Sequence, residues 1–153
     1  MIPPTSAPVV ARVPISVRWG DLDAFNHVNN AAFLVYAQEA RIVWLGQLGA
    51  SLRDASMMPV VAAASLNFRR QLGWPARIVV ELSVARLGRS SLTLAHRIVD
   101  ERDDTIVYAD GDTVMVWIDP ASGRSIALPA AVQALVQSCA ASGSITSNDV
   151  SMR

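Results

Sequence analysis

The chain has 153 residues, of which 52% are hydrophobic and 17% are charged, and its formal net charge at pH 7 is zero. This length suits one domain with a sizeable core, and the apolar content excludes a disordered chain. The neutral balance argues against nucleic acid as the main partner, because nucleic-acid binding requires a basic face.

The termini and the cysteine content suggest where the protein works. The first ten residues lack the basic and apolar regions of a signal peptide, and no apolar run approaches the ~20 residues of a membrane span. The single cysteine, Cys139, excludes an intrachain disulfide and fits a reducing compartment. We therefore expect a soluble cytoplasmic protein, and the high apolar fraction suggests a subunit interface.

The first predicted element is a half-buried strand that begins at Val9. Apolar residues alternate with Arg12, Ser16 and Arg18 along this segment, which is the period of a strand with one covered face. Gly20 and Asp21 end the strand. The alternating apolar residues are Val9, Ala11, Val13, Ile15, Val17 and Trp19.

A polar cluster follows at the point where the strand gives way to a long helix. Asn29 or Asn30 caps this helix, which is expected to reach about Gln47. The helix is hydrophobic on nearly all sides, and such a helix is usually enclosed by other elements. Unpaired N–H groups at its start can bind a carboxylate or a developing oxyanion. The cluster consists of Asp21, Asp23, Asn26, His27, Asn29 and Asn30.

Four more strands are expected after the helix, near residues 60–69, 78–84, 92–98 and 105–119. The last contains Asp110-Gly111, which we interpret as a bulge within one strand rather than a hairpin. A short helix follows from Ala130 to about Ser138. These elements predict an α+β fold with one antiparallel sheet, a single domain over residues 1–139, and a disordered tail over residues 140–153.

The segment from Arg18 to Asn30, RWGDLDAFNHVNN, resembles the hotdog-fold acyl-CoA thioesterases of the 4-hydroxybenzoyl-CoA thioesterase-like family. That family has the pattern R-[WY]-x-D-x-D-x-x-G-H-V-N-N before a long apolar helix. Asn26 stands where the family usually has Gly. Asn tolerates a left-handed backbone better than most residues, so we expect the turn to persist. The resemblance implies a hotdog fold, in which a curved antiparallel sheet of five or six strands wraps the central helix.

The resemblance also implies a set of catalytic groups. In this family the second Asp of D-x-D attacks the thioester or activates water, and that position is Asp23. A backbone N–H at the start of the central helix polarises the thioester carbonyl, and the corresponding residue is Asn30. His27 is a candidate for orienting groups or handling a proton. Asp21 is interpreted instead as a turn-forming residue at the end of the strand.

The binding of coenzyme A is expected at a second place, because the family binds the nucleotide end of coenzyme A near a turn with basic and hydroxyl groups. Here that turn carries Arg89, Ser90 and Ser91. Hotdog proteins are built as dimers, often paired into homotetramers, so we expect a homo-oligomer with a site shared between chains. No cofactor is expected, since coenzyme A belongs to the substrate. No metal is expected either, because HExxH and CxxC patterns are lacking.

Two other functions remain open at this point. A hotdog hydratase or dehydratase uses an Asp and a His in one short loop, and Asp23 with His27 superficially fits that scheme. The spacing of the loop and the pair Asn29-Asn30 fit the thioesterase pattern better. A non-catalytic acyl-CoA binder is the third possibility, although the chain carries no additional DNA-binding or partner domain.

Overall fold

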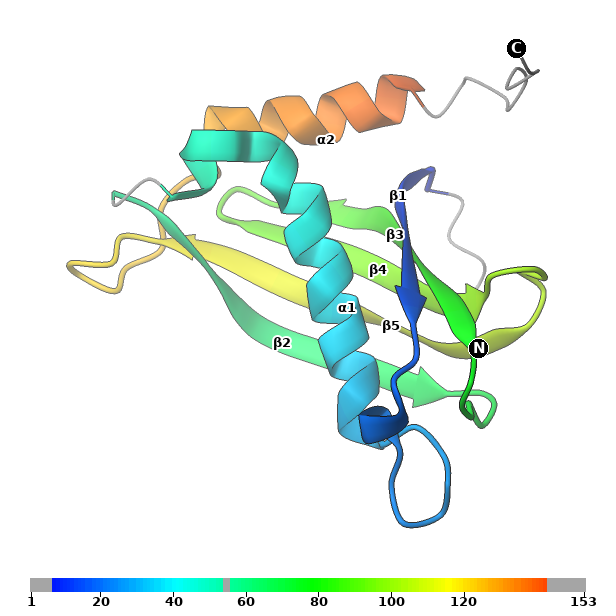
Figure 1. Ribbon diagram of the computed structural model, residues 1–153. Coiled ribbons are helices and arrows are strands. Elements are labelled where there is room, and N and C mark those ends of the chain that lie inside the picture. The colour runs from blue at the N-terminus through cyan, green and yellow to red at the C-terminus, as the bar shows by residue number, and fades with distance from the viewer. Residues whose placement is uncertain (1–6, 54–55, 143–153) are drawn as a thin grey trace.

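The computed structural model describes residues 7–53 and 56–142. Within these residues a five-stranded antiparallel sheet carries helix α1 (Asn30–Leu45) across one face (Figure 1). This is the predicted α+β arrangement, a long helix wrapped by a curved antiparallel sheet. The strands are β1 (Val9–Ser16), β2 (Met58–Phe68), β3 (Arg77–Leu87), β4 (Ser91–Asp100) and β5 (Val107–Ile118).

The order of the strands across the sheet is β1-β3-β4-β5-β2, and all neighbours are antiparallel. The first two strands of the chain therefore lie at opposite edges, and the chain crosses between those edges through α1. Hairpins join β3 to β4 and β4 to β5, since these strands follow one another both in sequence and in space. The positions of the two edge strands, and of α1 between them, therefore fix the position of the polar loop that joins β1 to α1.

Helix α1 begins after Asn29, whose side-chain Oδ1 accepts a hydrogen bond from the Ala31 N–H at 2.9 Å. This bond settles the choice between the two asparagines in favour of Asn29 as the cap. The helix ends at Leu45, slightly before the predicted Gln47, and the chain continues as the 3-10 segment η2 (Gly46–Arg53). Its buried side packs against β1 and β3 and includes Phe33, Tyr36, Ala37, Ala40, Arg41, Trp44 and Leu45.

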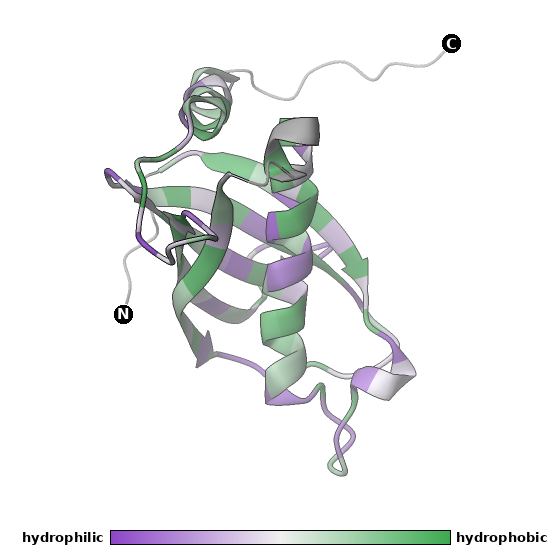
Figure 2. Ribbon diagram, turned by 90° about the vertical axis from the view of Figure 1, so that its left-hand side faces the viewer, coloured by the Kyte–Doolittle hydropathy of each residue, from purple (hydrophilic) through white to green (hydrophobic). Residues whose placement is uncertain are grey.

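The outward side of α1 differs from the prediction of an enclosed helix. Leu34, Val35, Ile42 and Val43 are all exposed. Figure 2 shows apolar segments above and below a polar band in the middle of the helix. One copy of the chain therefore covers only the sheet-facing side, and the apolar character of the other side has no counterpart within the described residues.

The core lies between α1 and the central strands, where alternate residues of β4 are fully buried. Helix α2 (Ala130–Ser142) adds a second layer at one end through Val132 and Leu135. It runs beyond the predicted end at Ser138, so the expectation of a disordered tail is wrong for residues 140–142, and residues 143–153 lie outside the described part. The central strands contribute Ile78, Val80, Leu82, Leu92, Leu94 and Ile98.

Strand β5 is continuous through Gly111, as the single-strand interpretation requires, but the expected bulge is not there. The register shifts of β5 lie instead opposite Val61 and Ala63 of β2, and opposite Ile98 and Val99 of β4. Gly111 has a different role, because a Cβ atom on it would lie 2.0 Å from the carbonyl oxygen of Ser65 on β2. The two backbones thus approach too closely for any side chain at this position.

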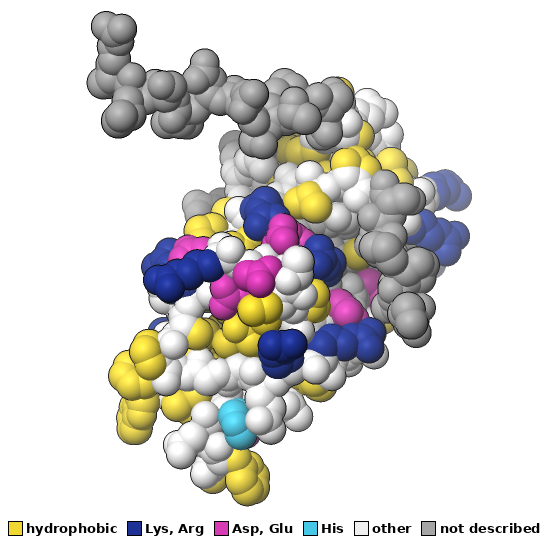
Figure 3. Space-filling view, turned by 90° about the vertical axis from the view of Figure 1, so that its right-hand side faces the viewer, with side chains coloured by type: hydrophobic (Ala, Val, Ile, Leu, Met, Phe, Trp, Pro, Cys, Tyr) yellow, Lys and Arg dark blue, Asp and Glu magenta, His cyan; other side chains and the backbone are white. Residues whose placement is uncertain are grey.

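The sheet face turned away from α1 is polar. Glu81 of β3 is buried because Arg12 of β1 and Arg97 of β4 both form ion pairs with it. Figure 3 shows basic and acidic side chains gathered on the side of the molecule that carries β1 and β3, above the half-buried histidine, His27.

Candidate active site

The loop before α1 is closed at its base by main-chain contacts. The 3-10 turn η1 (Trp19–Asp21) ends at Asp21, whose carbonyl accepts a hydrogen bond from the Asn29 N–H at 2.8 Å. A β-bridge joins Leu22 to Val28 directly above this bond. Residues 22–28 thus form a closed loop that projects beyond the end of the sheet (Figure 1).

Asp23 lies on this loop with one carboxylate oxygen engaged. Its Oδ1 accepts hydrogen bonds from the backbone N–H of Phe25 at 2.8 Å and of His27 at 3.4 Å. Its own N–H donates to the His27 carbonyl at 2.8 Å. Within the described residues, Oδ2 makes no hydrogen bond. The carboxylate therefore caps its turn and still presents a free oxygen.

Asn26 occupies the position of the usual family glycine and has a φ of 59°. This is the left-handed conformation that Asn adopts more readily than most residues. The expectation that the turn persists without Gly is confirmed.

Asn30 is the first residue of α1, and its side chain is exposed. The preceding amides are occupied, because the Val28 N–H donates to Leu72 and the Asn29 N–H donates to Asp21. The Asn30 N–H has no hydrogen-bond partner in the described part of the chain. It is consequently a free donor at the positive end of a helix dipole.

A cavity of about 500 Å³ joins these groups. Asp23, His27 and Asn30, which the sequence singles out, all line it, and the aromatic pair Phe33 and Phe68 lies at 5.4 Å between ring centroids. The residues that carry a carboxylate, an imidazole and the first amide of the helix therefore line one space, together with aromatic and basic side chains. This arrangement can place an electrophilic carbonyl between a donor and a base.

The opposite wall of the cavity was not predicted. It consists of residues 68–72, from the end of β2 and the segment that follows it. Arg69 is held by a two-pronged ion pair with Asp110, whereas Arg70 makes no ion pair among the described residues. No local pattern in the sequence indicates this wall, because it is brought to the loop by the pairing of β2 at the far edge of the sheet.

Asp21 is buried at 8% exposure, and its carboxylate accepts three hydrogen bonds. Tyr36 Oη donates to Oδ2 at 2.6 Å, the Arg18 N–H donates to Oδ2 at 2.9 Å, and Arg18 Nη2 donates to Oδ1 at 3.1 Å. Burial by itself raises the pKa of Asp21, but these bonds and the Arg18 charge together hold that pKa below its usual value. The interpretation of Asp21 as a structural residue agrees with this geometry, although its contact with Tyr36 was not foreseen.

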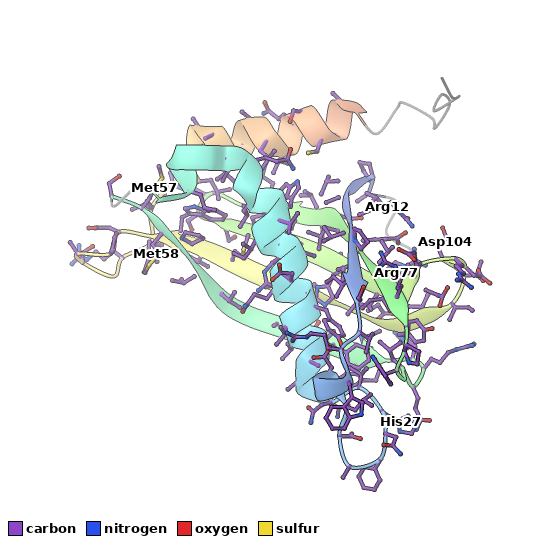
Figure 4. The ribbon with its side chains drawn as sticks, in the orientation of Figure 1. Arg12, His27, Met57, Met58, Arg77 and Asp104 are labelled. Carbon is purple, nitrogen blue, oxygen red and sulfur yellow. The ribbon has the colours of Figure 1, made fainter. Side chains whose placement is uncertain are left out.

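The turn Arg89-Ser90-Ser91 lies at the opposite end of the sheet from Asp23. Ser91 is level with Val116 of β5, whereas Phe68, which lines the Asp23 cavity, is level with Ala109. Seven residues of strand separate these levels, which is roughly 23 Å at about 3.3 Å per residue. Figure 4 shows His27 far from Met58, which pairs with Ile118 near the end of β5 that lies beside Ser91. One chain therefore does not bring the two predicted parts of the site together.

A larger cavity of about 710 Å³ lies on the other side of residues 71–76. Several of its polar side-chain groups already have partners in its own wall. Arg77 binds Glu101 at 2.8 Å, and Tyr108 Oη donates to Asp100 at 3.1 Å. None of the residues predicted to act in catalysis or binding lines it, so the smaller cavity is the better candidate for the site.

The described residues hold no group of three or more His, Cys, Asp or Glu side chains that is arranged to bind a metal ion. Among the same residues, no helix combines the length and the apolar character needed to cross a membrane.

Comparison with known proteins gives consistent matches. Residues 17–136 match the model of the thioesterase-like superfamily. A candidate thioesterase from Pseudomonas aeruginosa, PA2801, is 38% identical, with a TM-score of 0.78 over 84% of this chain and 98% of its own. A candidate acyl-CoA thioesterase from Xanthomonas campestris is 52% identical, with a TM-score of 0.68 over 73% of this chain and 95% of its own. The uncharacterised YsmA protein of Bacillus subtilis (strain 168) is 29% identical over 73% of this chain and 75% of its own.

Proposed function

Because the chain belongs to the thioesterase-like superfamily and has the hotdog fold, we propose that it is an acyl-CoA thioesterase. It hydrolyses an acyl-CoA thioester to a free acid and coenzyme A. The relatives support this choice of substrate, since the Xanthomonas campestris structure is described as a candidate acyl-CoA thioesterase.

The observation that carries the proposal is the shared cavity of Asp23 and Asn30. The free Asn30 N–H donates a hydrogen bond to the thioester carbonyl oxygen, and this bond strengthens as the oxygen becomes negative in the transition state. Asp23 faces the same space with its free Oδ2. Acyl transfer to water needs a hydrogen-bond donor for the thioester oxygen and a nucleophile or general base near the thioester carbon.

Two routes use the same atoms. Asp23 Oδ2 attacks the thioester carbon to give a mixed anhydride that water then cleaves, or it removes a proton from a water molecule that attacks instead. In both routes the C–S bond breaks, coenzyme A leaves as a thiolate and takes up a proton, and the carbonyl carbon gains an oxygen from water. His27, beside Asp23 on the loop, orients the attacking group or carries the proton.

We further propose that the working unit is a homo-oligomer built from dimers joined along β2, as a dimer or as a tetramer of two dimers. Strands β1 and β2 are the two edges of the sheet. Pro14 and the charge of Arg12 protect the β1 edge against pairing, whereas the middle of β2, residues 60–66, carries no charge and no proline. Val61 of β2 and the outer side of α1 also expose apolar side chains that a second copy would cover.

Pairing of two β2 edges about a two-fold axis also completes the site. Antiparallel pairing sets the start of one β2 beside the end of the other, so the partner subunit's Arg89 comes level with the Asp23 cavity. That turn lies about three strand spacings away, roughly 14 Å. A pantetheine arm crosses this gap and delivers the phosphates of coenzyme A to the partner's Arg89, Ser90 and Ser91.

The experiment is release of free thiol from a panel of acyl-CoAs with short aliphatic, long aliphatic and aromatic acyl groups. Thiol release with stoichiometric free acid is the expected result. Hydration or dehydration of an enoyl or hydroxyacyl thioester without thiol release would replace the proposal with the hydratase function that Asp23 and His27 superficially fit. Tight binding of acyl-CoA without turnover would identify a binder.

A further inference from the structure

The base of the catalytic loop is tied to α1 through one buried side-chain contact. Asp21 ends η1 immediately before the loop, and its carbonyl holds the N-cap residue Asn29 at 2.8 Å. Both ends of residues 22–28 therefore meet at Asp21. Any shift of Asp21 relative to α1 moves Asp23 relative to the Asn30 N–H.

The contact that prevents such a shift comes from the second turn of the helix. Tyr36 is buried, and its hydroxyl donates to Asp21 Oδ2 at 2.6 Å, a length typical of a strong bond to a charged acceptor. The Tyr36 ring also packs edge to face on Phe33, which lines the cavity, with 6.1 Å between ring centroids. The hydroxyl thus links the loop to a helix turn that is itself fixed in the core.

This contact persists over the ordinary range of pH. Burial and the hydrogen bond to Asp21 raise the pKa of Tyr36 well above its usual value, so the phenol stays protonated. The bonds from Tyr36 and Arg18 keep the neighbouring carboxylate ionised against the effect of burial. The donor and the acceptor therefore keep their roles wherever the enzyme works.

We propose that Tyr36 is a positioning residue for the hydrolysis: through Asp21 it holds the loop so that Asp23 and the Asn30 N–H face the thioester at the correct distance. The inference rests on the proposed thioesterase function. Tyr36 touches neither reacting group, so it acts on the geometry of the chemical step and not on substrate binding. Misplacement of a catalytic group by ~1 Å can lower a rate by about 100-fold.

The test is Tyr36→Phe, which keeps the ring and its contact with Phe33 and removes only the hydroxyl. We expect kcat to fall by about tenfold or more while KM changes by less than about twofold. Tyr108→Phe is the matched control, because its hydroxyl also donates to an aspartate, Asp100, at 3.1 Å. The control variant is expected to keep the kcat of the wild type.

A second measurement does not depend on activity. Hydrogen exchange of the amides of residues 22–29 is expected to accelerate in Tyr36→Phe and to stay unchanged in Tyr108→Phe, with the sheet protected in both. In Asp21→Asn a loss of kcat at least as large is expected, because the change removes the charge that accepts from both Tyr36 and Arg18. Adding Tyr36→Phe to Asp21→Asn should cost less than Tyr36→Phe costs in the wild type, since the two residues share one contact.

The outcomes separate the inference from the proposed function. A wild type that releases no thiol contradicts the function, whereas the exchange rates of the loop still decide whether Tyr36 holds it. Wild-type kcat in a folded Tyr36→Phe variant would overturn the positioning role. Equal losses of kcat in the two tyrosine variants would overturn it as well, since the effect would then come from a general loss of stability.

Discussion

Asp23 illustrates how one carboxylate can both cap a turn and remain available for chemistry. From sequence alone an Asp in such a loop is equally consistent with turn formation and catalysis. The hydrogen bonds are compatible with both roles, because the Phe25 and His27 amides both bind Oδ1 and leave Oδ2 without a partner among the described residues. The capping bonds fix the orientation of the side chain. A reacting group on a loop would lack a fixed orientation without such bonds.

Asn30 gives a prediction about a main-chain group. Asn30→Pro removes the N–H at the first helical position, where proline is tolerated, and Asn29 already has the extended ψ of 140° that a residue before proline prefers. Loss of an oxyanion donor lowers kcat by about 100-fold to 1,000-fold. Asn30→Ala keeps the N–H and changes only an exposed side chain.

The measurement is kcat for thiol release by both variants, with helix content checked by circular dichroism. We expect the proline variant to lose most of its turnover and the alanine variant to stay within about threefold of the wild type. Equal activities in the two variants would show that the Asn30 amide is not the donor.

The contacts of Tyr36 and of residues 68–72 could not be predicted from the neighbouring residues in the sequence. Tyr36 lies on a helix face where any large apolar residue would fit, and its partner is fifteen residues away in sequence. Nothing local distinguishes a tyrosine that donates to a buried carboxylate from one that only packs. Asn26, by contrast, was predictable, because the left-handed conformation at that position limits the residue types that fit.

At the scale of elements, the periodicity of the sequence predicted every strand and both α-helices, because each has a one-sided or fully apolar pattern. The order of the strands across the sheet was not predictable in the same way. β2 follows α1 in sequence but pairs with β5, some fifty residues later. Local patterns carry no information about such pairing, and the wall of the active-site cavity depends on it.

Gly111 gives a prediction about the junction of β2 and β5. A methyl group at this position would meet the Ser65 carbonyl, so the strands must separate in Gly111→Ala. We expect a loss of roughly 1–3 kcal/mol or more in the free energy of unfolding, as for other overpacked sites. Gly73→Ala is the control, because a Cβ atom there meets nothing within 4 Å.

Urea denaturation of the two variants measures this difference. The midpoint of Gly111→Ala should fall clearly below that of the wild type, while Gly73→Ala should change the free energy by less than ~0.5 kcal/mol. Indistinguishable midpoints would mean that the β2–β5 spacing adapts freely to a side chain.

At the scale of the whole molecule, we propose that the exposed apolar side of α1 and the unprotected edge of β2 both contribute to an interface between copies. The sequence predicted an enclosed helix, yet one chain covers only half of it. Enclosure of the other half by a second copy stays a prediction. In the dimer that we propose, the partner's turn takes the place of Arg89-Ser90-Ser91, which lies far from Asp23 within one copy.

Val61→Lys tests the proposed assembly. Val61 is 52% exposed on the β2 edge, and a lysine there would face its own copy across the two-fold axis and disfavour pairing. Val9→Lys is the matched control on the opposite edge strand, β1, where valine is 43% exposed. Light scattering coupled to size exclusion gives the mass of each variant.

We expect the wild type and Val9→Lys to have a multiple of the 16.4 kDa chain mass, and Val61→Lys to shift toward the monomer with loss of acyl-CoA turnover. A shift in Val9→Lys alone would place the interface on β1. A monomeric, fully active wild type would contradict the shared site.

The most direct measurement is the rate of thiol release by wild type, Asp23→Asn and Asp104→Asn on the best acyl-CoA of the panel. Asp104 lies in the β4–β5 turn, away from the loop that carries His27 (Figure 4), so it controls for the loss of a surface charge. We predict that Asp104→Asn keeps the wild-type rate and that Asp23→Asn loses at least about a thousandfold while staying folded. A folded Asp23→Asn variant with a near-normal rate would contradict the proposed mechanism.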